Sequence, residues 1–192
     1  MNFAITSIGR SGTKFLAKCL NDSTSMNVIH EAKGDNKSNM GNLCRFQKRF
    51  KDNYGEVNSF LRNVFSEIKV DKKAIIIRNP NDIVVSACNK HPRKLSSKNS
   101  IKNIIKDVSD GIILLDRYIS DDSIYYFMFE DMIKDINCIL SLGSFLGVKI
   151  NKDMINIKRK INNTNRQLIS SIEETGCDTS CFDWFIEKYY KG

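Results

Sequence analysis

The chain has 192 residues, with 30 Lys and Arg against 22 Asp and Glu, a net charge of +8 and 41% hydrophobic residues. Such a chain can bury a sizeable core as one domain spanning residues 1–192, which excludes collagen-like, coiled-coil and wholly disordered proteins. Its apolar stretches fall short of the roughly 18 to 20 residues that a membrane span needs.

The first residues predict a strand. Residues 3–8 form an almost unbroken apolar run, too short for an export signal and without its basic flank. We therefore expect a cytoplasmic protein whose six cysteines are reduced thiols. Cys177 and Cys181 are spaced like a metal-binding pair, but no second pair and no nearby histidine accompanies them, so we expect no metal site.

Strand-like runs alternate with helix-like segments along the chain. Apolar runs at 3–8, 74–77 and 125–129 are followed by helical segments at 11–21, 80–90 and 131–146, the last with Asp131 as N-cap and Gly147 as its stop. Further helical spacing is found at 42–51, 57–68 and 101–119. Runs that are apolar on both faces are typical of strands covered by helices. The predicted fold class is α/β, a P-loop-like open parallel sheet with helices on both faces, whose ligands bind beyond the carboxyl ends of the strands.

A loop with two glycines follows the first predicted strand. Gly9 and Gly12 allow a tight turn that presents backbone N–H groups, and the next helix adds the positive end of its dipole. The side chains that can donate hydrogen bonds into the loop are Arg10, Ser11, Thr13 and Lys14. The loop therefore predicts an anion-binding site.

This loop differs from the Walker A loop of kinases and nucleoside triphosphatases. Only two residues separate Gly9 from Gly12, and Phe15 follows Lys14 where Walker A places the hydroxyl residue that binds magnesium. The pattern therefore argues against nucleoside triphosphate hydrolysis and phosphoryl transfer.

A second anion-binding pattern follows the middle strand. Arg78 comes at the end of the apolar run, Pro80 suits the first turn of the next helix, and Ser86 follows eight residues after Arg78. A strand-end arginine and a serine about two helical turns later can converge on one phosphate, to which the guanidinium offers a planar fork.

These two segments resemble the sulfotransferases that use 3′-phosphoadenosine 5′-phosphosulfate (PAPS). Residues 9–15 are similar to their 5′-phosphosulfate loop, in the Arg-Ser-Gly form of the carbohydrate and bacterial branches, and residues 78–86 are similar to their 3′-phosphate motif. Residues 126–132 and 144–147 resemble two further family segments, with Phe129 in place of a tyrosine. The family's late Arg-Lys-Gly-x-x-Gly element is not found, and residues 158–160 or Arg166 are the candidates to replace it.

The resemblance implies metal-independent sulfuryl transfer from PAPS, as co-substrate, to the hydroxyl of a small-molecule or carbohydrate acceptor. The Arg-Ser-Gly form favours a carbohydrate acceptor. Arg10 would stabilise charge on the leaving oxygen, Phe15 would either stack on adenine or pack in the core, and Lys14 would contact phosphate or face solvent. The implied nucleotide-binding residues are Arg10, Ser11, Gly12, Thr13, Lys14, Phe15, Arg78 and Ser86.

The acceptor proton needs a base, for which the sequence offers two neighbours. Residues 26–31 read as a short second strand that delivers His30 and Glu31 to the same edge of the sheet, and either side chain can accept a proton. Since adjacent residues of a strand point to opposite faces, we expect only one of them to reach the acceptor, and Glu31 is favoured over His30.

Two other functions remain open at this point. One is a small-molecule or nucleotide kinase with a degenerate P-loop, which would need magnesium. The other is a basic nucleic-acid-binding module, suggested by the charge of +8. We expect no nucleic-acid partner, because the lysines are scattered along the chain rather than clustered.

Overall fold

The core of the protein is a parallel sheet of five strands. The structure is a computed structural model that describes residues 1–31, 39–49, 52–90, 97–157 and 169–191. Its strands are β1 (Asn2–Ser7), β2 (Asn27–His30), β3 (Tyr54–Val57), β4 (Lys72–Ile77) and β5 (Ile124–Met128), in the spatial order β2-β3-β1-β4-β5. All four neighbouring pairs are parallel. The predicted α/β class with an open parallel sheet is confirmed.

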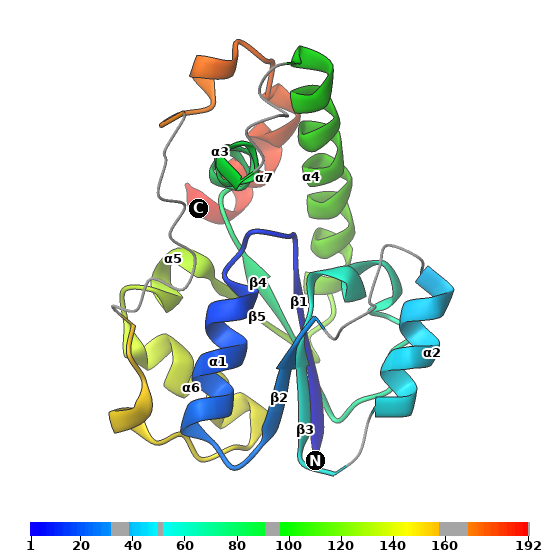
Figure 1. The fold of residues 1–192 in the computed structure, drawn as a ribbon, viewed down its shortest axis with the longest axis vertical. Coiled ribbons are helices and arrows are strands. Elements are labelled where there is room, and N and C mark those ends of the chain that lie inside the picture. The colour runs from blue at the N-terminus through cyan, green and yellow to red at the C-terminus, as the bar shows by residue number, and fades with distance from the viewer. Residues whose placement is uncertain (32–38, 50–51, 91–96, 158–168, 192) are drawn as a thin grey trace.

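Helices cover both faces of this sheet. Figure 1 shows α1 (Thr13–Ser23) and α6 (Ile136–Leu146) on one side, and α2 (Asn39–Arg49) on the other. The first pair packs in a core cluster around Phe3 and Ile5 of β1. The second cluster joins α2 to the 3₁₀ helix η1 (Ser59–Val64) and to α4 (Lys98–Ile119). Burial on both faces explains the unbroken apolar runs at residues 3–5 of β1 and 74–77 of β4.

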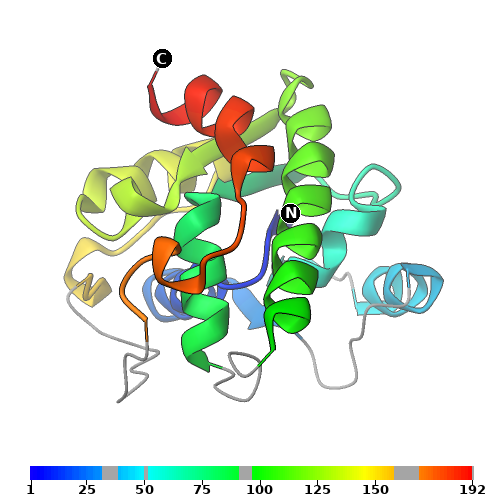
Figure 2. The same ribbon diagram turned by 90° about the horizontal axis from the view of Figure 1, so that it is seen from above.

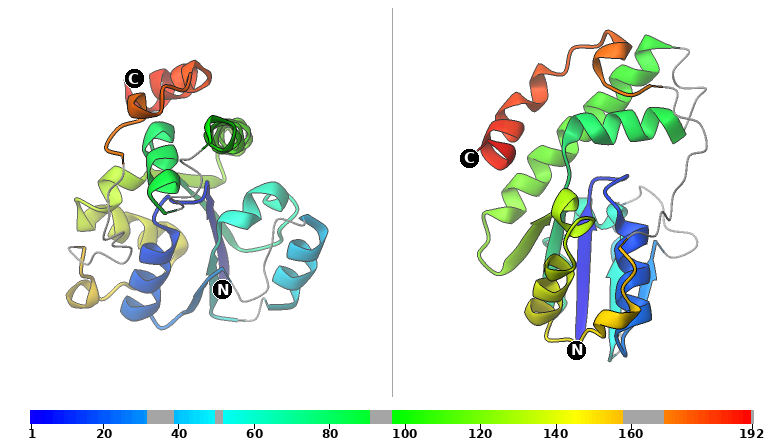
Figure 3. Two further views of the ribbon diagram at one scale, coloured as in Figure 1. Left: turned by 45° about the horizontal axis from the view of Figure 1, so that its top comes forward. Right: turned by 90° about the vertical axis from the view of Figure 1, so that its left-hand side faces the viewer.

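The carboxyl ends of the strands are covered by three helices. α3 (Pro80–Lys90) follows β4 and packs against α4, and the C-terminal α7 (Asp183–Tyr190) lies over the same end. Figure 2 looks down on this arrangement, and the right-hand view in Figure 3 shows these helices above the sheet. The remaining short helices are α5 (Phe129–Met132), η3 (Lys152–Met154), η4 (Glu173–Thr175) and η5 (Ser180–Phe182).

Strand β3 was not predicted from the sequence, and the helix expected at 57–68 is only the shorter 3₁₀ helix η1, because Val57 belongs to β3. The strand reads Tyr-Gly-Glu-Val, and its Gly55 and Glu56 hide the apolar pattern. Gly55 is required by packing, because a Cβ there would lie 2.1 Å from Cζ of Phe3. Glu56 is fully buried and paired with Arg49 at 2.7 Å. Tertiary packing thus overrides the weak local propensity of these two residues.

The expected helix at 131–146 is two helices. α5 begins at Phe129 after Met128 as N-cap, so Asp131 is not the cap that the sequence suggested. The chain then turns, and Asp135 caps α6 by accepting a hydrogen bond from the Asn137 amide at 2.9 Å. Gly147 ends α6 in the left-handed conformation (φ 70°), as predicted.

Candidate active site

Buried polar side chains gather where β1 and β3 end. Eight polar or charged residues are buried among those that the structure describes, and all but Ser23 lie in these two strands or in the segments that follow them. Interiors hold polar groups only when these are hydrogen-bonded or serve a ligand. This end of the sheet is also where the two anion-binding motifs meet, as expected from the parallel topology.

The loop between β1 and α1 has an unusual backbone. Arg10 (φ 74°) and Gly12 (φ 75°) are both left-handed, which for Arg10 stores strain of about 1 kcal/mol or more. A Cβ on Gly12 would lie 2.5 Å from Cε2 of Phe129, so only glycine fits there. α1 begins directly after this turn with no acidic residue in its first turn. Its unpaired amides and positive dipole end therefore face the loop.

Two donors at this loop lack a partner. In the described part of the chain, only four buried polar side-chain atoms have none, and these include Oγ of Ser11 and Nε of Arg78. An unsatisfied buried donor costs about 1–3 kcal/mol, which an anionic ligand would recover. A phosphate or sulfate group is therefore a chemically suitable occupant of this site.

The two site arginines form one cationic cluster. Arg78 donates a hydrogen bond from Nη1 to the carbonyl of Arg10, and its guanidinium lies 4.4 Å over the ring of Phe129. Arg10 in turn donates from Nε to Oγ of Ser86 at 3.2 Å. Burial, and next the charge of Arg78, lower the pKa of Arg10, and burial lowers that of Arg78. Both remain cationic at neutral pH, so the cluster favours an anion.

Arg10, Arg78 and Ser86 are thus brought together in one place. Ser86 contacts Arg10, and whether Ser86 and Arg78 also converge on one phosphate, as the motif predicts, stays a prediction. The Arg10 residue joins them, since its side chain binds Ser86 and its carbonyl binds Arg78. The nucleotide-binding roles of these residues stay predictions.

The other loop residues differ in their surroundings. Thr13, at the start of α1, places Oγ1 3.0 Å from Nε2 of His30. Lys14 is exposed. Phe15 is 8% exposed and belongs to the core cluster with Leu16 and α6, which favours the packing role over stacking on adenine.

Both candidate bases reach the same edge of the site. Glu31 follows β2 with φ 41°, which breaks the strand alternation, so the expectation that the two side chains diverge is wrong. Nε2 of His30 lies 3.8 Å from Oε1 of Glu31. Burial lowers the pKa of His30, and the charge of Glu31 offsets this only in part, so the neutral form of the ring prevails at pH 7. The negative charge of Glu31 opposes part of the lowering of the Arg10 pKa, so the carboxylate and the guanidinium interact electrostatically across the site.

Several residues at this end of the sheet were not predicted from the sequence. Ser59 donates a hydrogen bond to Oε1 of Glu31 at 2.5 Å, and it was missed because β3 was missed. Glu130 accepts hydrogen bonds from the Asn79 amide (3.3 Å) and from the hydroxyl of Tyr190 (3.1 Å) on α7. No signal in the sequence links Tyr190 to Glu130, because sixty residues separate them. The basic residues 158–160 and Arg166 lie outside the described residues.

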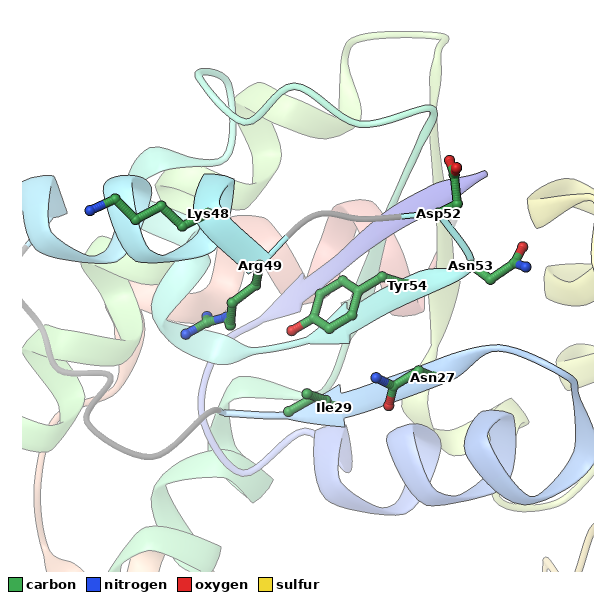
Figure 4. A pocket seen from close by; sticks show the side chains of 7 residues that line it. All are labelled: Asn27, Ile29, Lys48, Arg49, Asp52, Asn53 and Tyr54. Carbon is green, nitrogen blue, oxygen red and sulfur yellow. The ribbon is translucent and has the colours of Figure 1, made fainter.

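A separate pocket lies beside the first residues of β2 and β3. It has a volume of about 450 Å³ and is lined by Asn27, Ile29, Lys48, Arg49, Asp52, Asn53 and Tyr54, as Figure 4 shows. Asn27 and Tyr54 are the first residues of β2 and β3. The pocket therefore opens beside the edge strand and shares no residue with the two anion-binding motifs.

Neither a metal cluster nor a membrane helix is found in the described ranges. Among these residues, no group of three His, Cys, Asp or Glu side chains is arranged to hold a metal ion. No helix in the same ranges is long and apolar enough to cross a membrane.

The fold is that of sulfotransferases. The chain is similar to mouse sulfotransferase SULT7A1 complexed with PAP, with 19% identity and a TM-score of 0.58 over 78% of this chain and 60% of the mouse chain. It is also similar to the sulfotransferase from Alicyclobacillus acidocaldarius, with 17% identity and a TM-score of 0.58 over 84% of this chain and 86% of that chain. The sulfotransferase domain from the curacin biosynthetic pathway has 12% identity and a TM-score of 0.55, with coverage of 95% and 89%. No protein-family model and no curated protein sequence matches the chain.

Proposed function

We propose that this protein is a sulfotransferase that uses PAPS and transfers its sulfuryl group to an acceptor hydroxyl. The observation that carries the proposal is the pair of unpartnered buried donors, Oγ of Ser11 and Nε of Arg78, at a cationic loop. The 5′-phosphosulfate and the 3′-phosphate of one adenosine nucleotide would satisfy both donors. The sulfotransferase fold and the PAP bound to the mouse enzyme support the same reading.

Different residues of this chain hold the two charged groups of PAPS. Arg10 and the amides at the start of α1 hold the 5′-phosphosulfate, and Arg78, with Ser86 nearby, holds the 3′-phosphate. During transfer the bond from sulfur to the phosphate oxygen breaks while a bond from sulfur to the acceptor oxygen forms. Arg10 stabilises the charge that develops on the leaving phosphate, and it does so as a fixed cation rather than as a proton donor.

The acceptor proton goes to Glu31 in this proposal. His30 already shares Nε2 with Oγ1 of Thr13, so its ring is engaged by α1. Glu31 binds Ser59 through Oε1, and among the described residues none hydrogen-bonds its Oε2. That oxygen can accept the proton of an acceptor hydroxyl. A carbohydrate is the first acceptor class to try.

Thermal unfolding with three ligands tests the proposal. Adenosine 3′,5′-bisphosphate (PAP) without added metal should raise the melting temperature, because both phosphate sites are built from protein donors. At a PAP concentration of ~100 times its dissociation constant, the free energy of unfolding should rise by about 2.7 kcal/mol. Stabilisation by ATP with magnesium, or by a short oligonucleotide, but not by PAP would refute the proposal in favour of a kinase or a nucleic-acid-binding module.

A further inference from the structure

The carboxylate of Glu31 accepts a hydrogen bond from the segment that follows the neighbouring strand β3. Ser59, the first residue of η1 and 5% exposed, donates a hydrogen bond from Oγ to Oε1 of Glu31 at 2.5 Å. A Cβ on Gly9 would lie 4.0 Å from the same Oγ, so the hydroxyl also borders the phosphosulfate loop. Ser59 therefore lies between the loop and the candidate base.

Ser59 is itself held in place by its neighbour Asn58. The Asn58 amide donates to the carbonyl of Ile5 at 2.9 Å, and its carbonyl accepts from Oγ1 of Thr6 at 3.0 Å. Its side chain caps η1, with Oδ1 accepting from the Phe60 amide at 2.8 Å. The backbone just before and just after Ser59 is thus fixed to β1 and to the start of η1.

A buried carboxylate completes this support. Nδ2 of Asn58 donates to Oε1 of Glu56 at 2.7 Å, and Glu56 is fully buried. Arg49 binds both carboxylate oxygens from α2, and the Tyr54 hydroxyl donates to Oε2 at 3.0 Å. Figure 4 shows Arg49 and Tyr54 pointing to the same side of β3. Both oxygens of this buried carboxylate have hydrogen-bond partners, so the network anchors Asn58 and thereby the backbone beside Ser59.

We propose that Ser59 is a positioning residue for the transfer reaction, whose hydroxyl holds the Glu31 carboxylate toward the acceptor. The inference rests on the proposed function and adds a residue that no motif indicated. A glutamate side chain has several rotatable bonds, and its left-handed backbone at the end of β2 leaves it outside the sheet ladder. The Ser59 hydrogen bond removes part of that freedom and engages Oε1, so that Oε2 is presented to the acceptor.

Four variants test this inference: Ser59→Ala, Ser59→Thr, Glu31→Gln, and Ser59→Ala combined with Glu31→Gln. The assay is release of PAP from PAPS with a panel of hydroxyl acceptors, together with PAP binding by calorimetry. Ser59→Ala should bind PAP like the wild type and keep its KM for PAPS, while kcat falls roughly 10- to 100-fold, the range of one charge-assisted hydrogen bond. Ser59→Thr keeps the hydroxyl and should retain most activity.

The double variant separates positioning from a general structural effect. If Ser59 acts through Glu31, adding Ser59→Ala to Glu31→Gln should lower kcat by no more than about 2-fold. Ser144→Ala is the matched control, since it removes an exposed hydroxyl that bonds the Leu140 carbonyl on α6, away from the site. It should leave kcat unchanged.

The outcomes separate the inference from the proposed function. A wild-type kcat in Ser59→Ala would overturn the role of Ser59. So would a double variant whose loss of kcat equals the product of the two single losses. In both cases the sulfotransferase proposal stands. A wild-type protein that neither binds PAP nor releases it from PAPS would overturn the proposed function, and the role of Ser59 with it.

Discussion

Replacing Ser11 by alanine should change stability in opposite directions with and without ligand. The Ser11 side chain is fully buried, and its Oγ is without a hydrogen-bond partner in the described part of the structure. Removing an unsatisfied hydroxyl should stabilise the free protein by about 1 kcal/mol. For a domain of this size, that gain corresponds to a melting temperature about 2–4 °C higher.

Binding of PAP should reverse the order of the two melting temperatures. At ~100 times its dissociation constant, PAP should stabilise the wild type by about 2.7 kcal/mol. Losing the Ser11 hydrogen bond to a charged phosphate should weaken binding roughly 10- to 100-fold. At the same PAP concentration the variant then gains only about 0.4–1.4 kcal/mol. Ser11→Ala should therefore melt above the wild type when free and below it when PAP is present.

The assay is thermal unfolding of both proteins with and without PAP, and Ser23→Ala is the matched control. Ser23 lies at the far end of α1, and its Oγ is likewise buried and without a partner among the described residues. Ser23→Ala should stabilise the free protein to a similar degree and keep the full response to PAP. If Ser11→Ala lowers the melting temperature of the free protein, or keeps the wild-type response to PAP, the reasoning from the unpartnered hydroxyl is refuted.

Three further variants probe the rest of the site. Arg78→Ala should shrink the preference for PAP over adenosine 5′-phosphate by about one to two powers of ten in calorimetry, and equal weakening of both ligands would mean that Arg78 only supports the loop. Gly12→Ala should lower both the melting temperature and PAP affinity, because its Cβ would collide with Phe129 at 2.5 Å, and a normal melting curve would contradict the loop geometry. Glu31→Gln should bind PAP normally yet lose transfer by roughly 10²- to 10⁴-fold, with a smaller loss in His30→Ala; the reverse ranking of these two losses would assign the proton to His30.

Much of the fold could be predicted because most strands carry strong local signals. β1 and β4 contain continuous apolar runs at residues 3–5 and 74–77, which are buried on both faces of the sheet, and each strand is followed by a helix. β3 had no such signal, because its Gly55 makes room for Phe3 and its Glu56 depends on an arginine from α2. Both conditions arise only after distant segments pack together.

The candidate site was predictable in part for the same reason. Arg10, Ser11 and Arg78 belong to short motifs directly after strands, and parallel topology brings such motifs to one end of the sheet. The hydrogen bond from Ser59 to Glu31 joins residues 28 positions apart through a strand that the pattern did not reveal. The convergence of His30 with Glu31 depends on one positive φ, which a period-two reading of the strand cannot anticipate.

The central claim is tested most directly by following labelled sulfur from PAPS in the presence of a metal chelator. Purified protein is incubated with ³⁵S-labelled PAPS and a panel of carbohydrate and small-molecule hydroxyl acceptors, and both products are quantified. The account predicts equal amounts of PAP and labelled acceptor without metal, and a large loss of both products in Arg10→Ala. Absence of transfer to every acceptor, together with magnesium-dependent phosphorylation of an acceptor by ATP, would contradict it.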